Sequence, residues 1–179
     1  MLAVSQVAQL TSFPTTPHST MQPKTVLITG STRGIGLEFA KHFTNAGWKV
    51  IGVARNANQA DKLKALSPFK LVSFDCTDEA SIARAAEELE DVPVDLLINN
   101  AGIYKDGGLE TTSKEMLMRQ FEVNTTALHM VNRNMASKLK RDNIAMIILD
   151  PGMVYTTMPL RRTHRLLWLK WRMSSRRQQ

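Results

Sequence analysis

The sequence is poor in cysteine, in paired histidines and in long apolar runs, and each shortage excludes a class of protein. With one cysteine, Cys76, the chain forms no internal disulfide, which fits a reducing compartment and a cytoplasmic protein. The four histidines have no metal-ligand spacing with one another or with the cysteine, so we expect no metal site. No apolar run approaches the roughly 20 residues that a membrane-spanning helix needs.

Acidic residues are missing from both ends of the chain. Residues 1–23 carry neither acid nor base and are rich in Ser, Thr, Gln and Pro, which predicts a disordered leader. Residues 159–179 form a basic tail whose seven bases account for the whole formal net charge of +7. The tail contains both basic and aromatic residues, but on a helical wheel its apolar residues are spread nearly all round and form no separate apolar face. We expect neither membrane contact nor specific nucleic-acid binding from it, and interpret it as sequence read past a lost splice site.

The most informative stretch runs from Thr25 to Gly36. Val26-Leu27-Ile28 is typical of a strand buried on both faces, and a helical pattern of apolar residues begins at Ile35. Glycines between them let the backbone turn tightly and approach a phosphate, and the helix N-terminus offers unpaired N–H groups. This order predicts a phosphate cradle, although a glycine-rich turn between any strand and helix is the plainer alternative.

Further strands alternate with helices after this turn. We predict strands at residues 50–54, 71–74, 96–98 and 144–149, a short helix at 57–66, and a helix from an Asp78 cap to about Glu90. This alternation predicts an α/β fold with a Rossmann-like, doubly wound parallel sheet of about five strands, within residues 24–158.

One helical pattern is too long for such a fold. It begins at a capping box of Thr112 and Glu115 and continues to Asp142. A helix of that length spans about 42 Å, roughly twice the length of the neighbouring strands. We therefore predict a bend near Asn124-Thr125-Thr126, where side chains compete for backbone partners.

Together these segments resemble the short-chain dehydrogenase/reductase family. Thr29 to Gly36 is similar to its T-G-x-x-x-G-x-G cofactor turn, Asn99 to Gly102 to its N-N-A-G stretch, and Pro151 to Thr156 to its P-G-x-V-x-T loop. The wording of the glycine turn is similar to the carbonyl-reductase-like branch. The resemblance implies a Rossmann-type domain that binds a nicotinamide cofactor and moves hydride to or from a carbonyl or alcohol carbon.

The resemblance also implies roles for individual residues. Asp75 would bond the adenine amine, with capping of the following turn as the alternative, and Asn124 would be the one remaining residue of the catalytic tetrad. Cys76 is more typical of a small buried hydrophobe than of a reactive thiol. The implied cofactor-binding residues are Gly30, Ser31, Thr32, Arg33, Gly34, Ile35, Gly36, Arg55, Asp75, Cys76, Asn100, Ala101, Gly102, Pro151, Gly152 and Thr156.

Two arginines favour NADP(H) over NAD(H). Ala54 stands at the end of the second strand, where an acid would bind the ribose 2′-hydroxyl of NAD. Arg33 and Arg55 flank this place, and two guanidinium groups can bind a 2′-phosphate. The alternative is that both arginines are solvated surface residues.

The proton-transfer residues of the family are missing. Its chemistry needs a Tyr with a Lys one helical turn later, but Gly108 follows Tyr104 and Pro159 follows Tyr155 at that spacing. The strand that carries the family's Ser is missing too, and the overlong helix resembles halves of two family helices joined together. We therefore predict that an internal segment is absent, and that the strand at 144–149 lies beside the strand at 96–98.

The sequence thus predicts an NADP-dependent short-chain oxidoreductase by descent that keeps its cofactor half and is inactive or nearly so. A small carbonyl or alcohol would be the substrate of any remaining activity. The alternative is a non-catalytic protein that binds nucleotide, joins a homo- or hetero-oligomer, or contacts a membrane surface through the basic tail. A third possibility is a chain that never folds, because fewer strands bury less apolar area and leave an exposed sheet edge.

Overall fold

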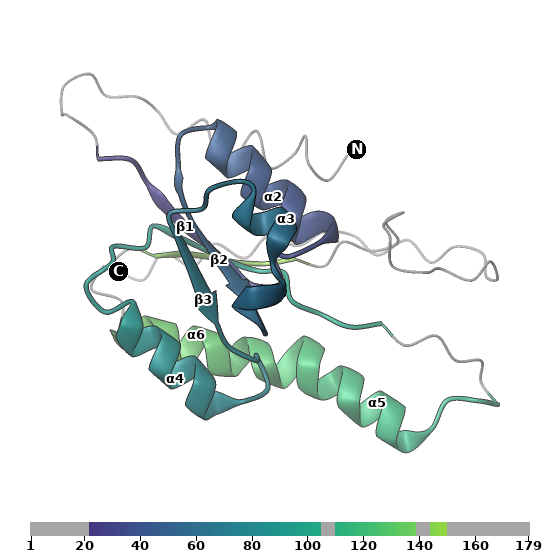
Figure 1. Cartoon of the computed structure of the whole chain (residues 1–179). Coiled ribbons are helices and arrows are strands. Elements are labelled where there is room, and N and C mark those ends of the chain that lie inside the picture. Colours follow the sequence, from purple (N-terminus) through teal and green to yellow (C-terminus); the bar gives the residue numbers. More distant parts are fainter. Residues whose placement is uncertain (1–21, 105–109, 139–143, 150–179) are drawn as a thin grey trace.

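The computed structural model describes residues 22–104, 110–138 and 144–149. Within these residues, five parallel strands form one sheet in the order β3-β2-β1-β4-β5, which confirms the predicted α/β fold (Figure 1). The strands are β1 (Thr25–Ile28), β2 (Lys49–Ala54), β3 (Lys70–Ser73), β4 (Leu96–Asn99) and β5 (Ala145–Ile148). The helices are α2 (Gly34–Asn45), η1 (Ala57–Gln59), α3 (Asp61–Lys64), α4 (Glu79–Glu88), α5 (Lys114–Phe121), η2 (Glu122–Thr126) and α6 (Ala127–Lys138).

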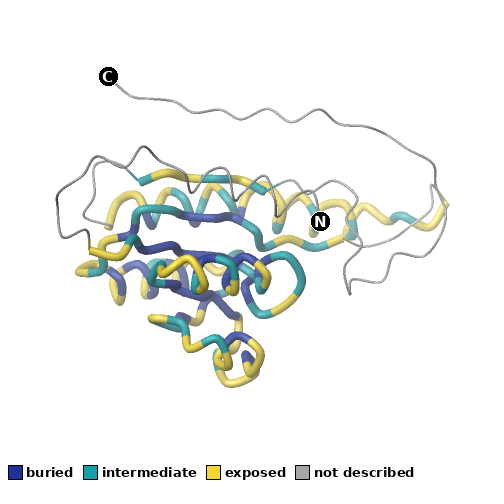
Figure 2. The backbone as a smooth tube through the Cα atoms, turned by 90° about the horizontal axis from the view of Figure 1, so that it is seen from above, coloured by how far each residue is buried: buried dark blue, intermediate teal, exposed yellow. Residues whose placement is uncertain are grey.

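Helices cover both faces of the sheet, and each face has its own apolar core. Side chains of α2 and α3 pack on Val26, Ile28 and Ile98 on one face. Side chains of α4 and α6 pack on Leu27 and Leu97 on the other face. The central strands are therefore buried on both sides, as Figure 2 shows, and this is why β1 reads as an unbroken apolar run.

Several local predictions are confirmed and two need correction. The Asp78 side chain accepts a hydrogen bond from the Ala80 amide, so it caps α4 as expected. The predicted helix at 57–66 is instead two short pieces, η1 and α3, because Ala60 between them is not helical. The cap of α5 is Ser113 and not Thr112, since the Ser113 hydroxyl accepts from the Met116 amide.

The long helical pattern is continuous from α5 through α6, with a change of winding in its middle. Residues Glu122–Thr126 form a π-helical segment, η2, where the sequence predicts a bend. The Thr126 hydroxyl donates to the Glu122 carbonyl at 2.7 Å, so a side chain does compete for a backbone acceptor there.

The last described strand lies where the sequence places it. β5 pairs in parallel with β4 in the register Leu96↔Ala145 to Asn99↔Ile148, so the expected neighbour relation is confirmed. The leader to residue 21 and the tail from residue 159 lie outside the described residues. No helix in the described part of the chain is both long enough and apolar enough to cross a membrane.

Candidate functional site

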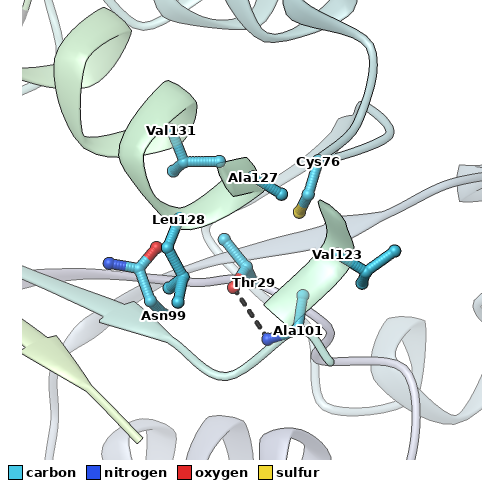
Figure 3. A pocket seen from close by; sticks show the side chains of 8 residues that line it. All are labelled: Thr29, Cys76, Asn99, Ala101, Val123, Ala127, Leu128 and Val131. Carbon is cyan, nitrogen blue, oxygen red and sulfur yellow. Dashed lines mark hydrogen bonds between the residues drawn. The ribbon is translucent and has the colours of Figure 1, made fainter. Parts of the chain in front are cut away.

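The site lies where the carboxyl ends of β1 and β4 meet, and Thr29 joins them. The Thr29 amide donates to the Ile98 carbonyl at 3.0 Å. Its hydroxyl oxygen accepts from the amides of Asn100 and Ala101, both at 3.0 Å (Figure 3 shows the second bond). Because Thr29 is buried, these bonds form away from water and fix the end of β4 against the start of the glycine turn.

The Asn100 side chain holds the glycine turn in place through two hydrogen bonds. Its Nδ2 atom donates to the carbonyls of Thr29 (2.9 Å) and Gly30 (3.1 Å). Gly30 has a φ of +66°, and a Cβ there would lie 2.9 Å from the Ala101 Cα. A Cβ on Gly36 would lie 2.3 Å from the Gly30 carbonyl oxygen. Turn, helix and β4 therefore approach one another more closely than any residue with a side chain would allow.

Ser31 fastens the same turn to β2. Its hydroxyl accepts from the Val53 amide at 2.8 Å and donates to the Val53 carbonyl at 3.1 Å, and the residue is fully buried. The Ser31 amide also donates to the Val53 carbonyl, at 3.3 Å, so the predicted contact of Ser31 with the cofactor stays a prediction. Thr32 and Ile35 lie half-buried in the turn.

The N-terminus of α2 is built to receive an anion. Arg33 is the N-cap in extended conformation, and no side chain caps the helix there or places an acid in its first turn. Gly34 has a φ of +55°, and no atom lies within 4 Å of where its Cβ would be. The first amides of α2 thus lie at the positive end of a helix dipole without a capping side chain, the arrangement that binds phosphate in many proteins.

Cationic side chains surround this end of the sheet. Arg33 and Arg55 are both exposed, one at the start of α2 and the other directly after β2. Partial burial by itself would raise the pKa of Asp75, but hydrogen bonds from Thr77 and the charges of Arg55 and Arg119 outweigh it and lower that pKa. Asp75 is therefore ionised at neutral pH.

One oxygen of Asp75 already has partners. Its Oδ1 accepts from the Thr77 amide at 2.9 Å and from the Thr77 hydroxyl at 2.8 Å. This is the turn-capping role that the sequence left open. The predicted contact with adenine stays a prediction, and the Oδ2 atom is the one for which no hydrogen bond occurs among the described residues.

A narrow apolar hollow lies beside these groups, between the strand ends and the helices η2 and α6 (Figure 3). Burial, and then the nearby Asp75 charge, raises the pKa of the Cys76 thiol to about 11, so the thiol stays protonated at neutral pH. This agrees with the interpretation of Cys76 as a small hydrophobe. The lining residues are Thr29, Cys76, Asn99, Ala101, Val123, Ala127, Leu128 and Val131.

Asn124 has a larger role than expected. Its Oδ1 accepts from the Ile103 amide and its Nδ2 donates to the Ile103 carbonyl, both at 2.8 Å. Asn124 lies in η2, where the sequence predicts a bend, and its side-chain amide in addition pairs with both backbone groups of Ile103. A Cβ on Gly102 would lie 3.3 Å from the same Oδ1 atom, so this clamp also sets the path of the chain after β4.

Three predicted site residues are not described by the structure, and three residues at the site were not predicted from the sequence. Pro151, Gly152 and Thr156 lie outside the described residues. Thr29 was visible as the first letter of the cofactor-turn pattern. Val123 and Arg119 carry no sequence signal, since only the fold brings η2 and α5 to the strand ends. In the described ranges no group of three His, Cys, Asp or Glu side chains could hold a metal ion.

Known proteins share both the sequence pattern and the architecture. The sequence model of the short chain dehydrogenase family matches residues 24–149. Serine 3-dehydrogenase of Rhizobium radiobacter is 45% identical over 83 residues, which cover 44% of this chain and 33% of the relative. A probable NADP-dependent dehydrogenase of Haemophilus influenzae is 33% identical over 135 residues, which cover 72% of this chain and 53% of the relative.

Solved structures agree with these sequence matches. A short-chain dehydrogenase from Streptomyces avermitilis superposes with a TM-score of 0.65 and 29% identity, covering 72% of this chain and 49% of that one. This chain therefore spans about half the length of that structure and between a third and about half of the two relatives. The family match, the parallel sheet and the glycine turn held by Asn100 place the chain in the short-chain dehydrogenase/reductase family, whose members bind nicotinamide cofactors.

Proposed function

We propose that this chain binds NADP(H) at the carboxyl ends of β1, β2 and β4. The observation that carries the proposal is the N-terminus of α2. No side chain caps its first amides, the space beside Gly34 is empty, and the turn before the helix is too tight for a side chain at Gly30 or Gly36. The diphosphate would lie against these amides. When bound, the cofactor supplies the hydride that such oxidoreductases transfer.

The other contacts follow from the positions of the described residues. The Oδ2 atom of Asp75 would accept a hydrogen bond from the adenine amine, because Oδ1 is already bonded to Thr77, and the backbone around Cys76 and Ala101 would contact the nucleotide. Asn124 would act at one remove, by fixing the backbone of Ile103 next to the cofactor path.

Preference for the phosphorylated cofactor rests on charge. Arg33 and Arg55 present two exposed cations beside a strand end that carries Ala54 instead of an acid. A 2′-phosphate between two guanidinium groups gains charge-assisted hydrogen bonds that a ribose hydroxyl lacks. Similarity to a probable NADP-dependent dehydrogenase supports the same choice.

Turnover is expected to be very low. The sequence has no Tyr-x-x-x-Lys, the pair with which members of this family move a proton to or from a carbonyl or alcohol oxygen. A positioned general acid or base usually contributes about 10²- to 10⁴-fold to the rate. The proposed protein is therefore a nucleotide binder with at most residual oxidoreductase activity.

Fluorescence titration with NADPH and with NADH tests the proposal. We expect NADPH to bind at least about tenfold more tightly, and Arg55→Ala to remove most of that difference while leaving NADH binding unchanged. Arg84→Ala, an exposed arginine on α4, is the matched control and should change neither value. Equal affinities would overturn the NADP preference, and no binding of either nucleotide would overturn the proposed site.

Activity is tested separately, because binding and turnover can fail independently. NADPH oxidation is followed with a panel of aldehydes and ketones. A rate near the common enzyme value of about 10 s⁻¹ would show that proton transfer survives without the Tyr and Lys.

A further inference from the structure

The loop between β3 and α4 carries Asp75, and hydrogen bonds to the first turn of α4 fix the backbone of this residue. The Asp75 amide donates to the Ser81 hydroxyl oxygen at 3.1 Å. The Asp75 carbonyl accepts from the Asp78 amide at 3.0 Å. The Ser81 hydroxyl itself donates to the Asp78 carbonyl at 2.8 Å, and Ser81 is buried. The main chain of Asp75 is therefore held at both of its polar groups.

The side chain of Asp75 is fixed by a single neighbour, Thr77. The amide and the hydroxyl of Thr77 both donate to the Oδ1 atom, at 2.9 and 2.8 Å. Two donors on one oxygen restrict rotation of the carboxylate, so the Oδ2 atom also has a defined position. Among the described residues no hydrogen bond reaches Oδ2. Since the pKa of Asp75 is lowered, the carboxylate is ionised at neutral pH and Oδ2 acts only as an acceptor.

The order of the strands places this acceptor in line with the phosphate cradle. β1, β2 and β3 are neighbours and run parallel, so their carboxyl ends lie at one edge of the sheet. The N-terminus of α2 follows β1, Arg55 follows β2, and Asp75 stands two residues after β3. Two strand spacings amount to about 10 Å. A nucleotide with its diphosphate at α2 and its sugar beside Arg55 would thus bring its base to the loop after β3.

We propose, resting on the proposed cofactor site, that Thr77 is a positioning residue that makes this site selective for 6-aminopurine nucleotides over 6-oxopurine nucleotides. Thr77 engages Oδ1 and leaves Oδ2 for the base. The amine on C6 of adenine donates to this acceptor. The carbonyl on C6 of hypoxanthine or guanine would instead place one acceptor against another, and neither group would have a partner. Ser81 supports the selection by holding the Asp75 backbone.

The first test compares NADPH with its hypoxanthine analogue, which carries a carbonyl in place of the C6 amine and has the same fluorescent nicotinamide. We expect the wild type to bind NADPH at least about tenfold more tightly, because the lost hydrogen bond has a charged acceptor. Thr77→Val removes the hydroxyl with little change of shape and should lower this ratio by at least about threefold. Thr77→Ser, the matched control, keeps the hydroxyl and should retain the ratio. A merely structural role for Thr77 would weaken both nucleotides equally and leave the ratio unchanged.

The second test exchanges the acceptor for a donor and does not depend on the stability of a Thr77 variant. In Asp75→Asn the amide oxygen should take the place of Oδ1, since Thr77 offers two donors there. The side-chain NH₂ group then stands in the place of Oδ2 and favours a C6 carbonyl. We therefore expect Asp75→Asn to prefer the hypoxanthine analogue. Adding Thr77→Val should weaken this inverted preference, because only the Thr77 amide then orients the side chain.

The outcomes separate this inference from the proposed cofactor site. No binding of either nucleotide by the wild type would overturn the cofactor site and the selectivity with it. Equal binding of both nucleotides leaves the cofactor site standing and overturns the selectivity. An unchanged ratio in Thr77→Val overturns the role of Thr77. A preference for NADPH that persists in Asp75→Asn shows that Asp75 does not contact the base at C6, and overturns the inference as well.

Discussion

Replacing Gly36 with alanine tests how tightly the glycine turn is held. Gly36 lies in the first turn of α2, so alanine would by itself favour the helix by about 1 kcal/mol. The added Cβ, however, would lie 2.3 Å from the Gly30 carbonyl oxygen and 2.4 Å from the Asn100 Nδ2 atom. A backbone oxygen cannot rotate away as a side chain can, so α2 must move away from β4.

The size of the effect follows from what that movement breaks. Overpacking of a closed site costs about 1–3 kcal/mol. Separation of Asn100 from the carbonyls of Thr29 and Gly30 adds roughly 1 kcal/mol for each lost hydrogen bond. After the helix gain is subtracted, we expect Gly36→Ala to lower the free energy of unfolding by about 2–4 kcal/mol.

Urea unfolding of Gly36→Ala and Gly34→Ala measures this difference. Gly34 has a φ of +55° but open space around its Cβ position, so its alanine variant bears only backbone strain of about 1–2 kcal/mol. Affinity for NADPH should fall in both, because both disturb the first amides of α2. Equal stability of Gly36→Ala and wild type would refute the packing that we assign to this turn.

Two further predictions concern titratable groups near the hollow. Because the pKa of Cys76 is raised to about 11, iodoacetamide should alkylate it very slowly at neutral pH and faster only as the pH approaches 11, which mass spectrometry can follow; rapid labelling at neutral pH would contradict its burial. The pKa of Asp75 is lowered in the folded state, so its stabilising contribution is present above the unfolded pKa of about 3.9 and is lost as the pH falls through the folded value. Asp75→Asn should therefore reduce the acid dependence of urea unfolding, and an unchanged dependence would contradict the Thr77 hydrogen bonds as its cause.

The order of strands and the cofactor turn could be predicted from the sequence because their signals are local. β1 is a run of apolar residues that ends directly in glycines, and Asp78 caps α4 through an amide two residues away. The contacts that hold the site together are not local. The Asn100 side chain donates to the Gly30 carbonyl, 70 residues away in the sequence, and no local pattern near either residue predicts this contact.

Side-chain roles were harder to predict than positions, since one residue type can satisfy several partners. Ser31 was expected to contact the cofactor, but its hydroxyl hydrogen-bonds to the backbone of Val53 in β2. Asn124 was expected to disturb a helix, and it also holds Ile103. In both cases the competing partner is a backbone group that only the folded sheet brings near.

The continuous helix from α5 through η2 to α6 is packed unevenly along its length. α6 provides the connection between β4 and β5: Val131 and Met135 fill the core with α4, and the Asn132 side chain accepts a hydrogen bond from the buried Asn99 at 2.8 Å. α5 buries no residue. An isolated helix of this length is marginal in water, so its cap at Ser113 and the continuous backbone into η2 must carry it.

The least buried helix, α5, therefore lies next to the site. Val123 and Asn124 stand in η2, between a helix that is packed and one that is not, and they form one wall of the hollow and the clamp on Ile103. Arg119, which helps to keep Asp75 ionised, stands on the unpacked side. We therefore expect the part of the site formed by β1, β4 and α2 to be rigid. The order of the part formed by η2 and α5 should depend on what covers the exposed face of α5.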